Sequence, residues 1–211
     1  RNAGEYQHWY GVKHPDPSRL QEATCGLTEL HREEISTAKL VAVPGCYPTG
    51  ALLALAPAIK AGLIKGDIVI DGKSGVSGAG RTLNLTTHFS EVNENVGAYA
   101  LDGHRHYPEI IQELRLLDPS LDLSVTFLPH LIPMTRGILA SCYAPLKNGM
   151  LSAGEAARSG ERLKSQTFET QNFGSSKITI LAADLVMVKG EKRFAAITNS
   201  SEARKSVIEI P

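Results

Sequence analysis

The sequence has few cysteines and no surplus of charge. Its 211 residues contain three cysteines, at positions 25, 46 and 142. An odd and widely spaced set fits neither a disulfide framework nor a paired zinc knuckle, so at least one thiol is expected to be free. The 22 lysines and arginines balance 22 aspartates and glutamates, and no basic run or aromatic-interleaved patch occurs. Nucleic acids and anionic membranes are therefore not expected as partners.

The sequence also lacks an unbroken apolar run that is long enough to span a bilayer. Its longest apolar stretch, residues 41–59, is interrupted by prolines, and the amino end carries no signal-peptide pattern. We therefore expect a cytoplasmic protein. With 42% hydrophobic residues, the chain is large enough to bury a core in one domain, with or without an appendage.

From residue 39 onward, strand-like and helix-like stretches alternate, which predicts an α/β or α+β fold. The expected strands are 39–43, 67–72, 96–101, 123–128 and 137–144. The expected helices are 48–60, which Pro57 should kink or shorten, 108–117 and 152–166. After residue 170, the runs KITIL, DLVMVK and RFAAIT are typical of hairpins at a sheet edge. Residues 1–38 are polar and irregular, with a short helix expected at 18–23 and a turn at 29–35.

The run PGCYPTG, residues 44–50, places Cys46 between a strand and the start of a helix, because Pro48 suits the first helical position. Unpaired backbone N–H groups and the helix dipole at such a position lower a thiol pKa from about 8.5 towards neutrality. Cys46 is therefore either a catalytic nucleophile or, as for many free cysteines, a small buried hydrophobe.

The run GHRHYPEI, residues 103–110, puts His104 and His106 in a loop before a helix. A loop histidine can serve as base or ion-pair partner for a cysteine and as proton donor to a leaving group. Two histidines on a wet loop can also be close by chance. A metal site needs a third ligand, and no Asp, Glu or Cys neighbour is an obvious one at short spacing, so we assign no metal.

Two further runs are candidate ligand sites. KSGVSGAGR, residues 73–81, is a flexible loop after a strand, where backbone can approach a phosphate or cofactor, although its spacing matches neither GxGxxG nor a Walker loop. In FLPHLIPMTRGILASCYAP, residues 127–145, Cys142 shares a strand face with Ile138 and Ala140 and is expected in the core. Arg136 is either an anion-binding or a solvated side chain, and His130 fits a structural role.

Taken in order, PGCYPT (44–49), GKSGVSGAGR (72–81), HRHYPEI (104–110) and FLPHLIPMTRGILA (127–140) resemble N-acetyl-γ-glutamyl-phosphate reductase of arginine biosynthesis, and more distantly aspartate-semialdehyde dehydrogenase. The resemblance covers about residues 1–146 and includes EYQHWYGVKH and LTELHREEI. It implies a glyceraldehyde-3-phosphate-dehydrogenase-like catalytic domain with a large mixed sheet flanked by helices. Subunits are expected to pair through this sheet into a homo-oligomer.

The resemblance also implies a mechanism. A cysteine thiolate attacks the acyl phosphate of N-acetyl-L-glutamyl 5-phosphate, phosphate leaves, and NADPH reduces the thioester to the semialdehyde. Cys46 matches the nucleophile, and His104, with His106 as the fallback, matches the acid and base. Ser74 and Gly75 are expected at the nicotinamide end of the cofactor. Charge logic makes Arg81, Arg105 and Arg136 candidates for binding the substrate's carboxylate or phosphate.

The chain departs from the family at both ends. No glycine-rich strand-turn-helix precedes Cys46, so residues 1–38 are expected to be a leading segment after a missing Rossmann domain, which would bind most of the NADP. Residues 39–170 are the expected catalytic and dimerisation domain. Residues 171–211 are expected to be divergent strands completing or flanking the sheet, with DLVMVKG only a faint match to the family. Val43 stands where the family commonly has asparagine.

Other functions remain open at this point. A cysteine-histidine enzyme could form the same acyl-enzyme and pass it to water or another acceptor, and a non-catalytic fragment could serve assembly alone. The motifs also do not separate the acetylglutamyl substrate from its one-carbon-longer aminoadipyl counterpart, since one methylene is worth only about 1–3 kcal/mol in a pocket.

Overall fold

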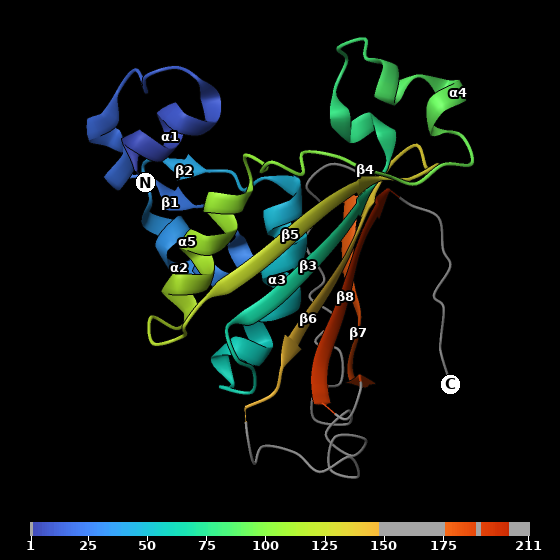
Figure 1. The fold of residues 1–211 in the computed structure, drawn as a ribbon. Helices are drawn as coiled ribbons and strands as arrows, with labels where there is room; N and C mark the ends of the chain where they lie inside the picture. The colour runs from blue at the N-terminus through green and yellow to red at the C-terminus, as the bar shows by residue number, and fades with distance from the viewer. Residues whose placement is uncertain (1, 148–175, 189–190, 203–211) are drawn as a thin grey trace.

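A computed structural model of the chain describes residues 2–147, 176–188 and 191–202, and for the last two ranges it describes the backbone. Figure 1 shows the order of the elements. The helices are α1 (Ala3–Tyr10), α2 (Thr28–Thr37), α3 (Cys46–Lys60), α4 (Phe89–Val92) and α5 (Tyr107–Leu117), with 3-10 helices η1 (Pro17–Gln21), η2 (Val76–Ala79) and η3 (Leu85–Thr87). The strands are β1 (Thr24–Cys25), β2 (Val41–Ala42), β3 (Asp67–Ser74), β4 (Gly97–Ala98), β5 (Ser124–Leu131), β6 (Ile138–Pro145), β7 (Ser176–Val188) and β8 (Glu191–Glu202). None of the described helices has the length and apolar character needed to cross a membrane.

The main sheet has six strands in the order β4-β5-β3-β6-β8-β7. β3 and β5 are parallel, whereas the other neighbouring pairs are antiparallel, so the sheet is mixed, as predicted. Successive side chains of a strand point to opposite faces. Ile68 and Ile70 of β3 are buried on the face that packs on helices, whereas Asp71 and Lys73 are half-buried on the other face. The two faces of this sheet therefore differ in chemistry.

Helix α3 supplies much of the core on the first face. It is apolar on all sides and most of its residues are buried, which is the pattern of a helix enclosed by other elements. The core joins it to the sheet and to α5, as Leu52, Ile70 and Ile110 illustrate. Pro57 is predicted to kink or shorten this helix, but α3 continues through it to Lys60. The expected core position of Cys142 is confirmed, because its side chain is fully buried on β6.

The amino-terminal part is more regular than predicted. Residues 1–38 contain the helices α1 and α2 in addition to η1, so their polar composition hid two helices. The predicted strand at 39–43 shrinks to β2, which pairs in parallel with β1 in a separate two-stranded sheet. Val43 is 85% exposed. Apolar character in this run therefore does not mark a strand of the main core.

Several other boundaries differ from the expected ones. The strand at 96–101 is only β4, and β5 extends through Pro129 to Leu131. The carbonyl of Pro129 faces the β4 side of the strand, where it accepts from the backbone N–H of Tyr99. The nitrogen of Pro129 faces the same side, beyond the end of the short strand β4, so its missing N–H removes no bond of the ladder. KITIL and DLVMV form one strand, β7, with a register shift between Ile180 and Ala182, and RFAAIT lies in β8. The expected helix at 152–166 lies outside the described residues.

Candidate active site

Cys46 is the first residue of α3, so the helix begins two residues earlier than the pattern predicts. Gly45 caps the helix, and its carbonyl accepts from both the backbone N–H and the hydroxyl of Thr49, at 3.0 and 2.9 Å. Pro48 therefore stands at the third helical position rather than the first. The Cys46 side chain is exposed, so the interpretation of this residue as a buried hydrophobe is wrong. The thiol is free, like those of Cys25 and Cys142.

Protein atoms crowded around the Cys46 thiol raise its pKa above the ordinary value by desolvation, although solvent reaches the side chain. The backbone N–H groups of Tyr47 and Cys46 act against this effect, as does the guanidinium of Arg105, whereas the Glu109 carboxylate adds to it. The predicted lowering by the helix terminus is therefore present but outweighed. This corrects the sequence-based expectation, because local position determines the N–H groups and only the fold determines the crowding.

Both histidines of the HRH run lie beside the start of α3. A methyl group placed on Gly45 would sit 2.6 Å from Nε2 of His106, so this ring rests directly on the residue before Cys46. Nδ1 of His104 accepts from the backbone N–H of His106 at 3.1 Å. This bond requires His104 to be neutral with its proton on Nε2.

The charge states of the histidines follow from their surroundings. Desolvation, with the Arg105 guanidinium, lowers the pKa of His104. Desolvation, with His104 and Arg105, lowers the pKa of His106 to about 4. Both rings are therefore neutral at neutral pH. Nδ1 of His106 is buried and has no hydrogen-bond partner among the described residues.

Tyr47 is the aromatic centre of this cluster. Its ring meets those of His104, His106 and Phe127 edge-on, with centroids 5.7, 6.1 and 5.2 Å apart. It also lies directly against β3, because a methyl group on Gly72 would be 2.5 Å from its Cε1. Glycine at position 72 is thus required for close approach of a ring, and α3, the HRH loop and β3 are held together around one side chain.

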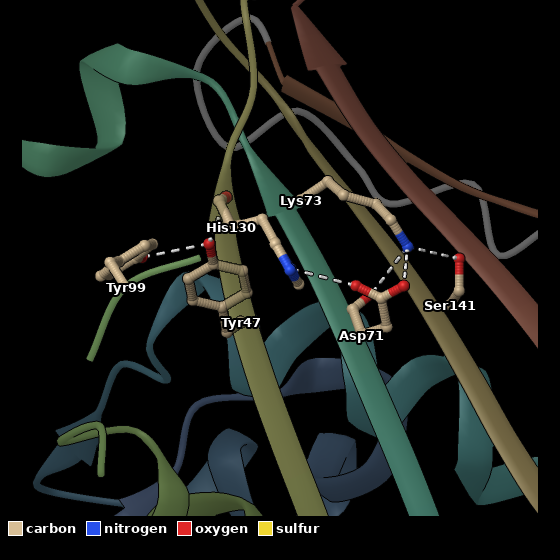
Figure 2. A network of polar contacts seen from close by, with 6 residues as sticks. All are labelled: Tyr47, Asp71, Lys73, Tyr99, His130 and Ser141. Atoms are coloured by element: carbon tan, nitrogen blue, oxygen red, sulfur yellow. Dashed lines mark hydrogen bonds and ion pairs between the residues drawn. The ribbon is translucent and has the colours of Figure 1, made fainter. Parts of the chain in front are cut away.

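A polar network extends from Tyr47 to the sheet, as Figure 2 shows. The hydroxyl of Tyr99 donates to that of Tyr47 at 3.1 Å, and Tyr47 donates to the carbonyl of His130 at 3.4 Å. Desolvation raises the pKa of the Tyr47 phenol above its usual range, with the bond to Tyr99 adding to it. Both hydroxyls therefore stay protonated and can act as donors.

The side chains beyond His130 complete this network. Nδ1 of His130 lies 3.2 Å from a carboxylate oxygen of Asp71, which is paired with the ammonium group of Lys73. Lys73 also donates to the hydroxyl of Ser141 at 3.3 Å (Figure 2). The His130 side chain thus lies at the end of this network at ion-pair distance from Asp71, although its Nδ1 makes no hydrogen bond among the described residues. The other members, Asp71, Lys73 and Ser141, come from β3 and β6.

The glycine-serine loop after β3 packs on the segment before β6. Ser74 and Gly75 are buried, and Gly75 donates to the carbonyl of Gly137 at 2.9 Å. A methyl group on Gly75 would meet the backbone of Arg136 at 2.7 Å, so this glycine is explained by packing. The exposed part of the loop is residues 77–80.

The three candidate arginines occupy different places. Arg105 lies close enough to the Cys46 thiol and to both histidines to shift their pKa values. Arg81 and Arg136 are exposed, on the loop after β3 and on the segment before β6. Arg105 is therefore the arginine that the fold brings into the cysteine-histidine cluster.

Comparison with known proteins identifies the fold that holds this cluster. The family described as "Semialdehyde dehydrogenase, dimerisation domain" matches residues 46–180. The chain belongs to the semialdehyde dehydrogenase family. The match begins at Cys46 and passes residue 146, so the family resemblance extends further towards the carboxyl end than the motifs predicted.

The curated relatives support the same assignment to the semialdehyde dehydrogenase family. The chain is 55% identical over 142 residues to N-acetyl-gamma-glutamyl-phosphate reductase of Dehalococcoides mccartyi, covering 67% of this chain and 42% of that protein. It is 52% identical over 162 residues to the reductase of the same name from Heliobacterium modesticaldum, covering 75% and 46%. The chain thus spans less than half the length of these relatives. The resemblance predicted from the four motifs is confirmed.

Solved structures agree on the fold of this semialdehyde dehydrogenase domain. Aspartate semialdehyde dehydrogenase II of Vibrio cholerae superposes with a TM-score of 0.58 at 12% identity, covering 85% of this chain and 63% of that one. The enzyme of Francisella tularensis gives a TM-score of 0.55 at 16% identity, covering 86% and 66%. The predicted mixed-sheet catalytic fold is therefore confirmed.

Sequence reasoning missed several members of the site. Tyr47 stands inside the quoted PGCYPTG run and Glu109 inside HRHYPEI, yet neither was singled out, because an aromatic or acidic residue in a motif carries no sign of its partner. The Glu109 carboxylate accepts from the backbone N–H of Gly45 at 2.9 Å. Tyr99 lies in no motif, and only the pairing of β4 with β5 brings it to Tyr47.

Proposed function

We propose that this chain is the thioester-forming part of an enzyme that reduces N-acetyl-L-glutamyl 5-phosphate to the 5-semialdehyde. One observation carries the proposal: an exposed cysteine at the start of a helix, with two neutral histidines and an arginine beside it. The substrate follows from the name of the relatives, which are N-acetyl-gamma-glutamyl-phosphate reductases. The alternative substrate with one more methylene stays outside this proposal.

In the first step, Sγ of Cys46 attacks the acyl carbon, a C–S bond forms, and the bond to the phosphate oxygen breaks with release of inorganic phosphate. The thiol proton must leave as this happens. A neutral histidine is the group that can take it. The N–H groups at the start of α3 are placed to stabilise the oxygen anion that develops on the attacked carbonyl.

His104 is our first choice for the acid and base, with His106 as the fallback. The bond from the His106 N–H holds the proton of His104 on Nε2, so in this tautomer His104 can donate to oxygen as the acid, and it takes the thiol proton only after Nδ1 gives up this bond. Nδ1 of His106 is buried without a hydrogen-bond partner in the described structure, so it has no such bond to give up. Arg105 is the proposed partner of the substrate's phosphate or carboxylate, and Arg81 and Arg136 are weaker candidates on charge alone.

The reduction step needs NADPH, which supplies a hydride to the thioester carbon when it is bound. The residues present fit the nicotinamide end of such a cofactor, because small exposed residues at 77–80 follow the carboxyl end of β3. Ser74 and Gly75, the predicted contacts, lie buried beneath them and would support this loop. In this reduction the role of Cys46 would be to leave the reduced carbon as a thiolate, which would release the aldehyde.

Intact mass after brief mixing with N-acetylglutamyl phosphate, without NADPH, tests the thioester step. We expect one acyl group per chain on Cys46, matching phosphate release, and no adduct in Cys46→Ser. His104→Asn should slow acylation by about 10²–10⁴-fold, and His106→Asn by less. An unmodified chain that releases no phosphate would refute the proposed chemistry.

The fate of the thioester separates the reductase from an acyl-transfer or hydrolytic enzyme. We expect the adduct to persist in buffer. It should be converted to aldehyde only when NADPH is added together with a full-length N-acetyl-gamma-glutamyl-phosphate reductase from one of the relatives. In that added protein, the cysteine equivalent to Cys46 is replaced by serine, so that it can supply the cofactor but not the thiol. Rapid loss of the adduct to water, with no aldehyde, would favour the hydrolytic function instead.

We also propose that two copies pair through the sheet face opposite to α3, in line with the description of the family as a dimerisation domain. Leu128 of β5 is 37% exposed and lies in register with Asp71 of β3, while its neighbour Phe127 packs towards the core. Leu128→Arg should therefore shift the mass measured by light scattering towards the monomer. Leu83→Arg, at a 99% exposed loop position, is the matched control, and an equal effect of both variants would contradict this interface.

A further inference from the structure

A second group of reactive side chains lies outside the cluster around Cys46. Cys25 of β1, His31 of α2 and Glu113 of α5 each offer one donor atom, and these atoms all lie within 4.8 Å of one another. Cys25 and Glu113 are 8% and 2% exposed. Sulfur, imidazole nitrogen and carboxylate oxygen form a donor set typical of zinc sites.

The donors come from segments that are distant in sequence. Nε2 of His31 lies 2.9 Å from a carboxylate oxygen of Glu113, across 82 positions. The backbone of α2 leaves helical geometry at His31, with φ of −129° and ψ of 30°. A residue that interrupts its own helix to meet a buried carboxylate is part of a specific site rather than of a solvated helix face.

Two further residues hold the donors from behind. Nδ1 of His31 is 3.8 Å from a carboxylate oxygen of Glu34, and the other oxygen of Glu113 accepts from the Gln112 amide at 2.9 Å. Metal-binding histidines usually face a carboxylate with their second nitrogen, and metal-binding carboxylates are hydrogen-bonded in turn. The Gln112 bond matches the second part of this arrangement, and Glu34 faces His31 at ion-pair distance without a hydrogen bond.

We propose that Cys25, His31 and Glu113 bind a divalent transition metal ion of the zinc type. Two donors on such an ion, bound at about 2.0–2.3 Å, lie about 3.3–3.8 Å apart, so the present positions need only small adjustments. A thiolate, a carboxylate and a neutral imidazole balance the two positive charges, which limits the cost of burial. Cys25 and Glu113 also line an open groove bordered by Tyr6 and Trp9, where water can supply a fourth ligand.

The metal would join β1, α2 and α5, and its binding should depend on pH. A cysteine binds metal as the thiolate, so binding must release the thiol proton, and the affinity should fall as the pH is lowered.

Cobalt titration of the full chain tests this site, with Cys46→Ser in every sample to remove the exposed thiol. We expect one Co²⁺ per chain and an absorption band from thiolate to cobalt. This band should be absent in Cys25→Ser and in His31→Asn, whose folding is checked by circular dichroism. Glu34→Gln should weaken binding by about tenfold, whereas Glu33→Gln, at the preceding exposed position, should not change it.

The outcomes are distinct. A thiolate band that disappears with Cys25 and is displaced by equimolar Zn²⁺ supports the site. No band in the parent, or a band that persists in Cys25→Ser, overturns it and leaves these three residues as a hydrogen-bonded contact between α2 and α5. Neither result affects the proposed chemistry at Cys46, because the acylation experiment uses a different thiol.

Discussion

The Cys46 thiol shows how opposing local effects set the reactivity of one residue. Helix N–H groups and Arg105 favour the thiolate, while desolvation and Glu109 favour the thiol, and the sum raises its pKa. A thiol that is protonated at rest is protected from oxidation and needs a base at the moment of attack. The neutral histidines beside it meet this need.

Changing the charge of Glu109 should change the reactivity of Cys46. Glu109→Gln keeps a carbonyl oxygen for the Gly45 N–H but removes the negative charge, so the pKa of Cys46 should fall. We expect iodoacetamide to alkylate Cys46 about two- to fivefold faster at pH 8, since each pKa unit changes the thiolate fraction up to tenfold. Arg105→Gln should have the opposite effect.

Rates are read by peptide mass spectrometry from pH 6 to 10, with buried Cys25 and Cys142 as internal references. In all variants the Cys46 rate should rise with pH. A slower Cys46 in Glu109→Gln would mean that this carboxylate acts through its hydrogen bond rather than its charge.

At the level of the elements, α3 and β3 approach closely enough to exclude a side chain from position 72. The ring of Tyr47 occupies that space, and its hydroxyl is held by Tyr99 and by the His130 carbonyl. β3 is held by strands on both sides, so it cannot move away from the ring. The position of the helix start, and of Cys46 with it, thus depends on this contact.

Gly72→Ala should therefore destabilise the chain by about 1–3 kcal/mol, because the new methyl group would lie 2.5 Å from Cε1 of Tyr47. Urea unfolding followed by circular dichroism measures this change. Gly97→Ala in β4 is the control, since its methyl group would meet nothing within 4 Å. Equal stability of the two variants would show that the ring moves away at no cost.

At the scale of the whole molecule, histidines that are neutral in the folded chain make the free energy of unfolding depend on pH. The pKa of His106 is about 4 in the folded chain against an ordinary value of 6.5, so the unfolded chain binds more protons between these values. Its contribution is complete above pH 6.5 and is lost as the pH falls towards 4. At 1.36 kcal/mol per pKa unit, the loss is at most about 3 kcal/mol.

Comparing the free energy of unfolding at pH 7 and pH 4.5 tests this expectation. His106→Gln should reduce the difference between the two pH values relative to the parent chain, since its side chain does not titrate. His88→Gln, at an exposed position, should leave the difference as in the parent. A parent-like pH dependence in His106→Gln would mean that the acid sensitivity arises elsewhere.

The sequence by itself determined the family and the main elements. The helix α3 and the strands β3 and β6 were predictable from their apolar runs, and the mixed sheet from the resemblance of the four motifs to a known family. An exposed, reactive Cys46 was only one of the two alternatives that the sequence left open. The helices α1 and α2 within residues 1–38 were not predictable, since they are polar on most sides.

Only the tertiary structure decided how the site works. The pKa of Cys46 and of the two histidines depends on desolvation, and desolvation comes from atoms distant in sequence that no local pattern reports. The same holds for Tyr99 on Tyr47, for Gly72 beneath that ring and for Cys25, His31 and Glu113, which β1, α2 and α5 bring together. Sequence patterns describe what each segment buries, whereas the chemistry of a site depends on which segments meet.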